Sequence, residues 1–324
     1  MVIFVGGSSS WQPVPTGAPA PAVRAPGSRA ATGKLEDVEM MLPGAGALFE
    51  AAGVRPGVGA TCDRCPRCDP EGADMSLIEW IAVAAAGFGA GAVNTIVGSG
   101  SLITYPVMVL LGVPPVTANI ANTVGLVPGS VAGAWGYRDR LGGTRPLLLR
   151  LGAASLAGAV CGAALLTRLP KSSFAAAVPV LILAAALLVG LQPLIVRRTK
   201  PTERTRWRQV TFWVFLTGVY GGYFSAAQGV ILLGLLGLFL ASGLQQQNAV
   251  KNVLQALVNL VAAVFLVVTA GVAWRYAAMV AIGSLVGAPV GAALAKKIPT
   301  GPFRAGIVVF GVLMAGVMAW LARR

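Results

Sequence analysis

Polar residues that could bind a small anion interrupt an apolar stretch near residue 100. Asn94 and Thr95 precede the segment Gly98-Ser99-Gly100-Ser101, which divides two hydrophobic runs. Glycine lets the chain turn here, and Ser99 or Ser101 could cap the helix that follows. The free N–H groups and positive dipole end of that helix would favour an anion. A packed polar kink without a ligand is the alternative, but a second break at Ala227-Gln228-Gly229 favours a functional site.

Amide and hydroxyl side chains gather at the start of the next apolar run after each break. Side chains at helical spacing share one face, so each cluster can point into one space. Such amides would either donate hydrogen bonds to a small oxyanion or join neighbouring helices. Lys251, the only cation in the clusters, would either pair with the substrate or snorkel to the membrane interface. The first cluster is Asn119, Asn122 and Thr123, and the second is Asn248, Lys251, Asn252 and Gln255.

Other chemistry finds little support in the residues. Cys62, Cys65 and Cys68 have a spacing that suits zinc or an iron–sulfur cluster. A fourth ligand is missing, because the chain has no histidine and Cys161 lies inside an apolar run. We therefore expect neither a metal nor a cofactor. We also expect no enzyme, since no acid–base pair or nucleotide-binding P-loop motif is evident.

The composition indicates a membrane protein. Hydrophobic residues make up 56% of the chain and charged residues 11%, against about 25% charged in ordinary soluble domains. Residues 75–324 hold 19 Lys and Arg but only three acids, Glu79, Asp139 and Glu203. The basic residues lie between apolar runs and not along one face, which argues against nucleic-acid binding. The scarcity of acids argues against a carboxylate proton relay.

Residues 1–74 differ from the rest of the chain. This stretch is rich in Pro, Gly and Ala and sustains no helical period. It cannot bury enough apolar surface to offset its chain entropy, so we expect disorder. Because Met75 directly precedes the first long apolar run, residues 1–74 are interpreted as a dispensable extension or a mis-assigned start.

The remainder predicts an all-α polytopic membrane protein made of two homologous repeats, residues 75–200 and 201–324. Residues 155–165 align with residues 284–294 at an offset of 129, and Asn122 matches Asn252 at 130. Each copy carries glycines four residues apart, which serve either close helix packing or a hinge. The predicted apolar segments are 77–97, 102–113, 116–137, 146–167, 172–196, 210–228, 230–241, 249–270, 274–295 and 303–321.

The charge of the loops predicts that the two repeats are inverted. Loops 138–145 and 197–208 are strongly basic and are assigned to the cytoplasm. In the second copy the basic loop is instead residues 296–304, so the balance reverses. Inversion requires an odd number of crossings in each copy: five, or three if the broken segments form a re-entrant hairpin. Inverted repeats with broken helices are typical of secondary transporters.

The motifs in the first repeat resemble those of the TauE/SafE sulfite exporter family. They are Gly87-Phe-Gly-Ala-Gly91, Val97-Gly-Ser-Gly-Ser-Leu102, Tyr105-Pro106, Leu111-Gly-Val-Pro-Pro115 and Ala118-Asn-Ile-Ala-Asn122-Thr, with weaker copies after Gly218. The resemblance covers residues 76–322. The first break is poorer in glycine than is usual in the family, and the second keeps only Gly229.

This resemblance implies a multi-pass permease of the inner or plasma membrane that moves small anions, often sulfur-containing ones such as sulfite or sulfoacetate. Together with the residues it predicts a secondary carrier that works by alternating access around a midplane site. Its partners would be the anion and the lipid bilayer. The direction of transport, the coupling ion and a homo-oligomeric state stay open. A non-transporting membrane scaffold or assembly subunit is the alternative, although it leaves the paired polar breaks without a purpose.

Overall fold

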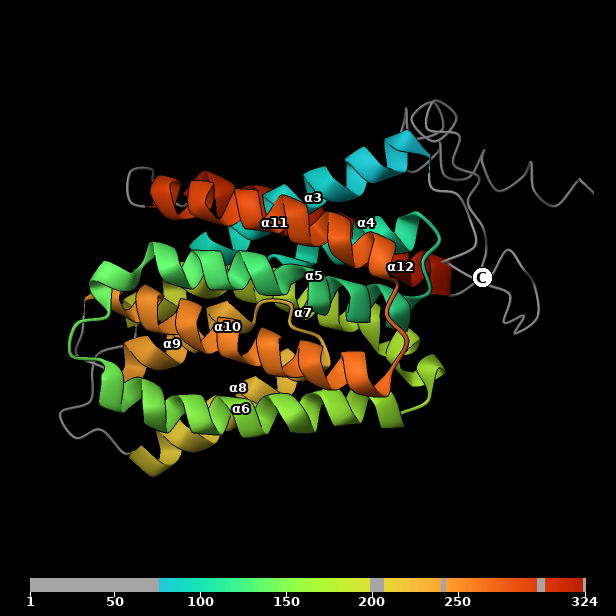
Figure 1. Ribbon diagram of the computed structural model, residues 1–324. Coiled ribbons are helices and arrows are strands. Elements are labelled where there is room, and N and C mark those ends of the chain that lie inside the picture. The colour runs from blue at the N-terminus through green and yellow to red at the C-terminus, as the bar shows by residue number, and fades with distance from the viewer. Residues whose placement is uncertain (1–75, 199–206, 240–242, 296–300, 323–324) are drawn as a thin grey trace, which may run out of the picture. The chain divides into compact units, whose positions relative to one another are not determined.

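A computed structural model describes residues 76–198, 207–239, 243–295 and 301–322 (Figure 1). The predicted extension 1–74, with Cys62, Cys65 and Cys68, lies outside the described residues. Within these ranges every regular element is helical. The elements are α3 (Leu77–Ile96), α4 (Ser101–Leu110), α5 (Pro115–Gly136), the short 3₁₀ helix η1 (Arg138–Arg140), α6 (Arg145–Arg168), α7 (Lys171–Arg198), α8 (Trp207–Tyr223), α9 (Gln228–Phe239), α10 (Leu244–Thr269), α11 (Trp274–Ala295) and α12 (Gly301–Ala322).

Each of the ten predicted apolar segments forms a helix, with two boundaries corrected: α10 begins at Leu244, five residues before the predicted start, and α8 ends early. The sixth segment was expected to continue to Gln228, but α8 ends at Tyr223 and α9 begins at Gln228. The second break is therefore residues 224–227, which begins three residues earlier than predicted. Five of the described helices, α3, α6, α7, α10 and α11, are long and apolar enough to cross a membrane. The all-helical polytopic prediction is confirmed.

The glycines of the small-residue faces pack helices against one another. Helix α3 lies along α11, and α6 lies along α8. A methyl group added at Gly291 would come within 2.6 Å of the Ala92 Cα, and one added at Gly162 within 2.8 Å of the Tyr223 backbone nitrogen. In lipid, association of helices depends on such close van der Waals contact.

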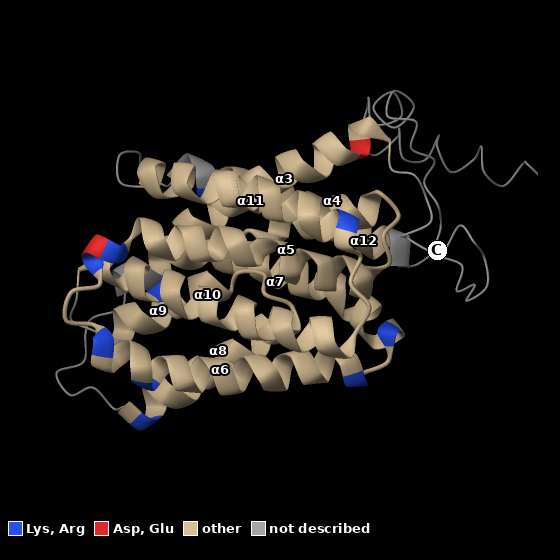
Figure 2. Ribbon diagram, in the orientation of Figure 1, with Lys and Arg blue, Asp and Glu red and all other residues tan. Residues whose placement is uncertain are grey.

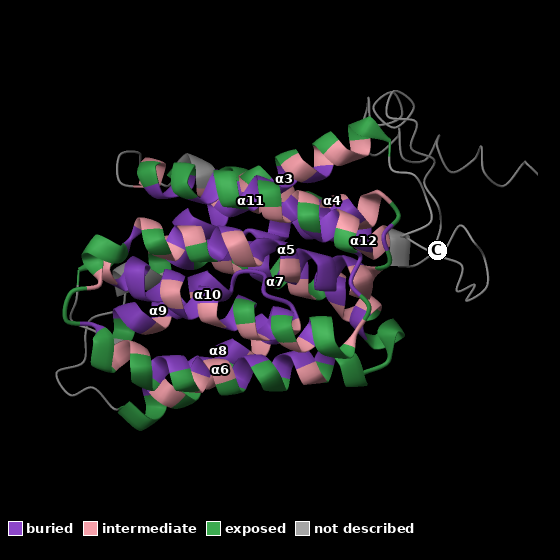
Figure 3. Cartoon of the chain, in the orientation of Figure 1, coloured by how far each residue is buried: buried purple, intermediate pink, exposed green. Residues whose placement is uncertain are grey.

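The buried centre of the molecule lies around α5, α10 and the two breaks (Figure 3). Large apolar side chains on the outer faces are exposed instead, including Trp135, Val268 and Val180. Such an outer surface suits a hydrocarbon environment, where apolar side chains face lipid. Charged residues are found mainly near the helix ends (Figure 2), which is where they meet the headgroups and water.

Four of the long helices can be followed along their length in Figure 1. There, α5 and α11 run from right to left, whereas α6 and α10 run from left to right. By the offset of 129 residues in the sequence, α5 corresponds to α10 and α6 to α11. The pairs α3–α11 and α6–α8 each join one helix from either half.

Candidate functional site

The two breaks meet at a pair of glycines. The Gly229 N–H donates a hydrogen bond to the Gly98 carbonyl over 3.1 Å. Gly98 has φ +86°, a conformation that residues with a Cβ rarely adopt. A methyl group on Gly229 would lie 2.5 Å from the Gly98 Cα. The backbones of the two halves thus touch where a larger side chain could not fit.

The first break is organised by Asn94 and not by a serine cap. The expected cap from Ser99 or Ser101 is wrong, because Gly100 occupies the N-cap of α4 and makes no side-chain cap. The Gly100 N–H instead donates to the Asn94 Oδ1 over 3.3 Å. Ser101 accepts a hydrogen bond from Asn122, and the buried Ser99 Oγ has no partner.

The second break has a strained backbone. Ser225 and Ala227 have φ of 64° and 58°, values that are uncommon for residues other than glycine. Strain of this kind persists only where the surroundings fix it, and it clusters at functional sites. Ser225 is held by a hydrogen bond from its Oγ to the Asn259 Oδ1 over 3.0 Å.

A chain of hydrogen bonds links the two breaks through the centre of the molecule. Asn94 donates to the Ser130 Oγ over 3.3 Å, and Asn259 donates to the same atom over 2.8 Å. Ser130 and Asn259 lie 129 residues apart, the same spacing as the sequence repeat. The sequence interpretation missed Ser130, Ser225 and Asn259. Ser130 and Asn259 could have been found as polar residues at equivalent places in two apolar segments.

Lys251 binds the end of the opposite broken helix. Its side chain is 0% exposed, so snorkelling to the interface is excluded in this structure. The Nζ donates to the Thr95 carbonyl over 3.1 Å and to the Asn94 carbonyl over 3.5 Å, and the Asn252 Nδ2 donates to the Thr95 carbonyl over 3.5 Å. A cation is favourable at a helix C-terminus, where carbonyl groups lack intrahelical partners.

Asn119 binds the end of α8, just as Lys251 binds the end of α3. Its Nδ2 donates to the Tyr223 carbonyl at the end of α8 over 2.9 Å. Each of the two long polar helices, α5 and α10, therefore binds the end of the broken helix that belongs to the other half. This crossed arrangement ties the geometry of each break to the position of the polar helix that binds it.

Other predicted site residues form hydrogen bonds within their own helix or to a neighbouring helix. Thr95 and Thr123 donate to the carbonyls of Gly91 and Asn119 on their own helices. Asn248 donates to the Tyr137 hydroxyl over 3.0 Å. Asn122 donates to Ser101 over 2.9 Å and accepts from Thr104. For these four residues the structure supports helix–helix or local hydrogen bonding.

Buried polar atoms without a hydrogen-bond partner surround the contact of the two glycines. The Ser99 Oγ and both amide atoms of Gln228 are unpartnered in residues that adjoin Gly98 and Gly229. The Gln255 Oε1 is also unpartnered and would lie 2.8 Å from a methyl group on Gly229. Buried polar groups are nearly always bonded, and leaving one unbonded costs about 1–3 kcal/mol. A bound polar molecule at this place would satisfy them.

Within the described residues there is no group of three or more His, Cys, Asp or Glu side chains that could hold a metal ion. The polar cluster therefore consists of neutral amides, hydroxyls and one ammonium, a donor set that suits an anion better than a metal ion.

The sequence profile of a known family, described as Sulfite exporter TauE/SafE, matches residues 83–318. The chain belongs to this family. Among curated proteins, it is 30% identical over 223 residues to a probable membrane transporter protein, ORF9, of a Sinorhizobium species. That match covers 68% of this chain and 84% of the relative. It is 24% identical over 241 residues to a probable membrane transporter protein of Haemophilus influenzae. That match covers 72% of this chain and 92% of the relative. No solved structure matches the chain.

Membership of the TauE/SafE family confirms the resemblance seen in the sequence and identifies a membrane transporter. With its several apolar helices the chain is a multi-pass protein of the cell membrane. The matched residues include both breaks and both polar helices, so the crossed arrangement lies within the family region.

We expect Asn122→Ala to lower stability more than it lowers anion affinity. The substitution leaves the buried hydroxyls of Ser101 and Thr104 without their hydrogen-bond partner. Each hydroxyl that finds no new partner lowers the free energy of unfolding by about 1–3 kcal/mol. Thermal unfolding of the purified protein measures the loss. Gln246→Ala is the control, because that amide bonds the Gly142 carbonyl in an exposed place and should change stability by under about 0.5 kcal/mol. Equal melting temperatures for the two variants would contradict the assignment.

Proposed function

We propose that this TauE/SafE transporter is a secondary carrier that binds a small sulfur-containing oxyanion or organosulfonate, such as sulfite or sulfoacetate, where its two breaks meet. The observation that favours this most is the fully buried ammonium of Lys251. In the described part of the chain its hydrogen-bond partners are backbone carbonyls and no carboxylate. A buried charge is costly unless it is paired. A bound anion would supply that pairing.

The neutral groups around the glycine contact support the same ligand. Ser99 and Gln228 offer unused donors beside Gly98 and Gly229, and Gln228, Gln255 and Asn119 offer unused acceptors. An oxyanion that carries a proton, such as hydrogensulfite, can use both kinds of group. Gln255 lies one helical turn beyond Lys251 on α10 and donates to the Asn94 Oδ1 over 2.7 Å. The ammonium and the unpartnered atoms are thus joined through Asn94.

Two inverted repeats, residues 75–200 and 201–324, would give this carrier its alternating access. The opposite directions of equivalent helices in Figure 1 and the exchange of partners in α3–α11 and α6–α8 support inversion. The basic residues of η1 and those at the start of α6 follow one another at the same end of the molecule, which we assign to the cytoplasm (Figure 2). Because each half binds the broken helix of the other, rocking of one half would open the site on one side while closing it on the other.

Flux into proteoliposomes tests the proposal. We expect purified protein to move radiolabelled sulfite or sulfoacetate down its gradient, and to be stabilised against heat by these anions more than by acetate. Empty liposomes and the Lys251→Gln variant are the controls. If none of a panel of sulfite, thiosulfate, sulfoacetate, sulfate and carboxylates is transported or stabilises the protein, the carrier is excluded and a non-transporting membrane scaffold is favoured.

A further inference from the structure

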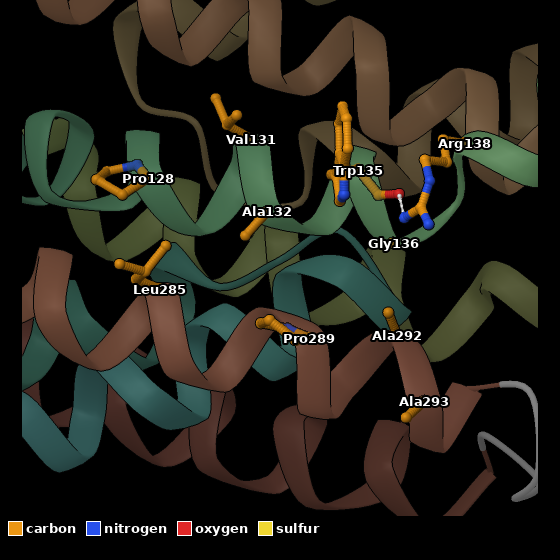
Figure 4. Close-up of a pocket in the computed structure, with 10 residues that line it drawn as sticks. All are labelled: Pro128, Val131, Ala132, Trp135, Gly136, Arg138, Leu285, Pro289, Ala292 and Ala293. Carbon is orange, nitrogen blue, oxygen red and sulfur yellow. Dashed lines mark hydrogen bonds between the residues drawn. The ribbon is translucent and has the colours of Figure 1, made fainter.

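A groove on the lipid-facing surface lies apart from the polar centre. It runs between α5 and α11, has a volume of about 810 Å³, and is of the size of small-molecule pockets, roughly 300–1,000 Å³. Figure 4 shows its two walls: side chains of α5 on one side and side chains of α11 on the other. The lining is apolar except at one end, where Trp135 and Arg138 lie side by side.

Two prolines and small side chains line the groove, and the two helices touch beside it, since a methyl group added at Gly136 would lie 2.9 Å from the Ala292 Cβ. Farther along the same pair, α5 and α11 approach closely, since the Ser284 Oγ donates to the Gly125 carbonyl over 3.0 Å. Pro128 and Pro289 stand inside the two helices and line the groove. Proline removes a backbone hydrogen bond and bends a helix. Small side chains such as Ala132 and Ala293 leave the space on the outer side of the two helices unfilled.

The two prolines that line the groove have no counterpart in the corresponding helices of the sequence repeat. At the offset of 129 residues, Pro128 corresponds to Leu257 and Pro289 to Val160. The equivalent pair α10–α6 therefore lacks both prolines. The two prolines are therefore specific to the pair α5–α11, and the sequence repeat does not account for them.

Arg138 gives the groove a positive end. Its guanidinium lies 5.0 Å from the centre of the Trp135 ring, and its Nη1 donates to the Trp135 carbonyl over 3.3 Å. Arginine has five N–H donors, so the remaining donors can bind a phosphate oxygen. Arg140 lies on the same short helix, and with Asp139 between them this end of the groove has a net positive charge. Trp135 is 68% exposed and is of the residue type that marks the headgroup level.

We propose that this groove is a binding site for an anionic phospholipid, with an acyl chain lying between α5 and α11 and the phosphate at Arg138. Basic sites between transmembrane helices at the headgroup level are suited to such lipids. A soluble anion would gain nothing from the long apolar walls. A second copy related by a two-fold axis along the membrane normal would bring its own Arg138 and Arg140 to the same depth, where like charges repel.

Native mass spectrometry of the purified protein with phosphatidylglycerol or phosphatidylcholine of identical acyl chains tests this site. We expect the wild type to bind phosphatidylglycerol about fivefold or more tightly than phosphatidylcholine, and Arg138→Gln to lose that preference, as suits one surface arginine near a headgroup. Ala293→Trp, which fills the groove, should lower the affinity for both lipids. Lys171→Gln and Ala184→Trp, exposed at other places, are the matched controls and should behave as wild type.

Three outcomes would overturn the lipid site: equal binding of the two lipids by wild type, an unchanged preference in Arg138→Gln, or equal effects of Ala293→Trp and Ala184→Trp. A shift from dimer to monomer in Ala293→Trp without loss of lipid would also overturn it and assign the groove to a second copy. Arg138 is exposed, so its variant keeps the test valid if Ala293→Trp fails to fold.

Discussion

Lys251→Gln is expected to raise the dissociation constant for the transported anion by about 30-fold or more. Truncating one member of a buried charge pair costs roughly 2–5 kcal/mol, and the lower end of that range corresponds to such a factor. Glutamine can still donate a hydrogen bond to the Thr95 carbonyl, which Lys251 now binds over 3.1 Å. The substitution therefore removes the positive charge while keeping a contact to the end of α3. The shift of the melting temperature across an anion titration gives the dissociation constant.

The matched control for this variant is Lys171→Gln. Lys171 is an exposed lysine at the start of α7, so its loss changes the net charge by the same amount without touching the breaks. Anion affinity in the control should equal that of wild type. If Lys251→Gln stays folded and binds the anion with wild-type affinity, then Lys251 only stabilises the end of α3 and the proposed anion site is wrong.

Gly229→Ala is expected to destabilise the protein and to reduce flux at least tenfold. The added methyl group would lie 2.5 Å from the Gly98 Cα and 2.8 Å from the Gln255 Oε1. Extra atoms in a well-packed place cost about 1–3 kcal/mol through forced shifts. Here the shift separates the two breaks, which the Gly229–Gly98 hydrogen bond holds together. Thermal unfolding and proteoliposome flux, each measured on protein purified from the membrane, report the two effects.

Gly316→Ala controls for the chemistry of the substitution. Gly316 lies inside α12, and a methyl group there meets nothing within 4 Å. Alanine is favoured over glycine within a helix by about 1 kcal/mol, so this variant should be as stable as wild type or more so, with normal flux. Normal flux in Gly229→Ala would show that the contact of the breaks is not needed for transport.

Much of the fold could be predicted from the sequence, because helix formation in lipid depends on local patterns. The apolar runs gave ten helices, including the short α4 and α9, with most boundaries within three residues of those observed. The error at the end of α8 arose because residues 224–227 are apolar or small and carry no breaking residue. Ser225 and Ala227 adopt positive φ through tertiary contacts that local propensity does not report.

The candidate site was predicted in part. Sequence spacing brought out Asn94, Lys251 and Gln228, which the structure gathers around the breaks. It assigned Asn122 and Thr123 to the same space; Asn122 does bond Ser101 beside the first break, whereas Thr123 bonds the Asn119 carbonyl of its own helix. Spacing along a helix tells which residues share a face, and it does not tell which neighbour that face meets. That depends on how the two halves pack.

By itself, the sequence determined that this chain is a membrane-embedded helical transporter of the TauE/SafE type, since composition, run length and motif order are local properties. Only the tertiary structure decided that the breaks touch at Gly98 and Gly229, that Lys251 binds the end of α3, and that Ser130 meets Asn259. These contacts join residues more than 100 positions apart. They depend on which helices the glycine faces bring together, and that choice is made by packing across the whole molecule.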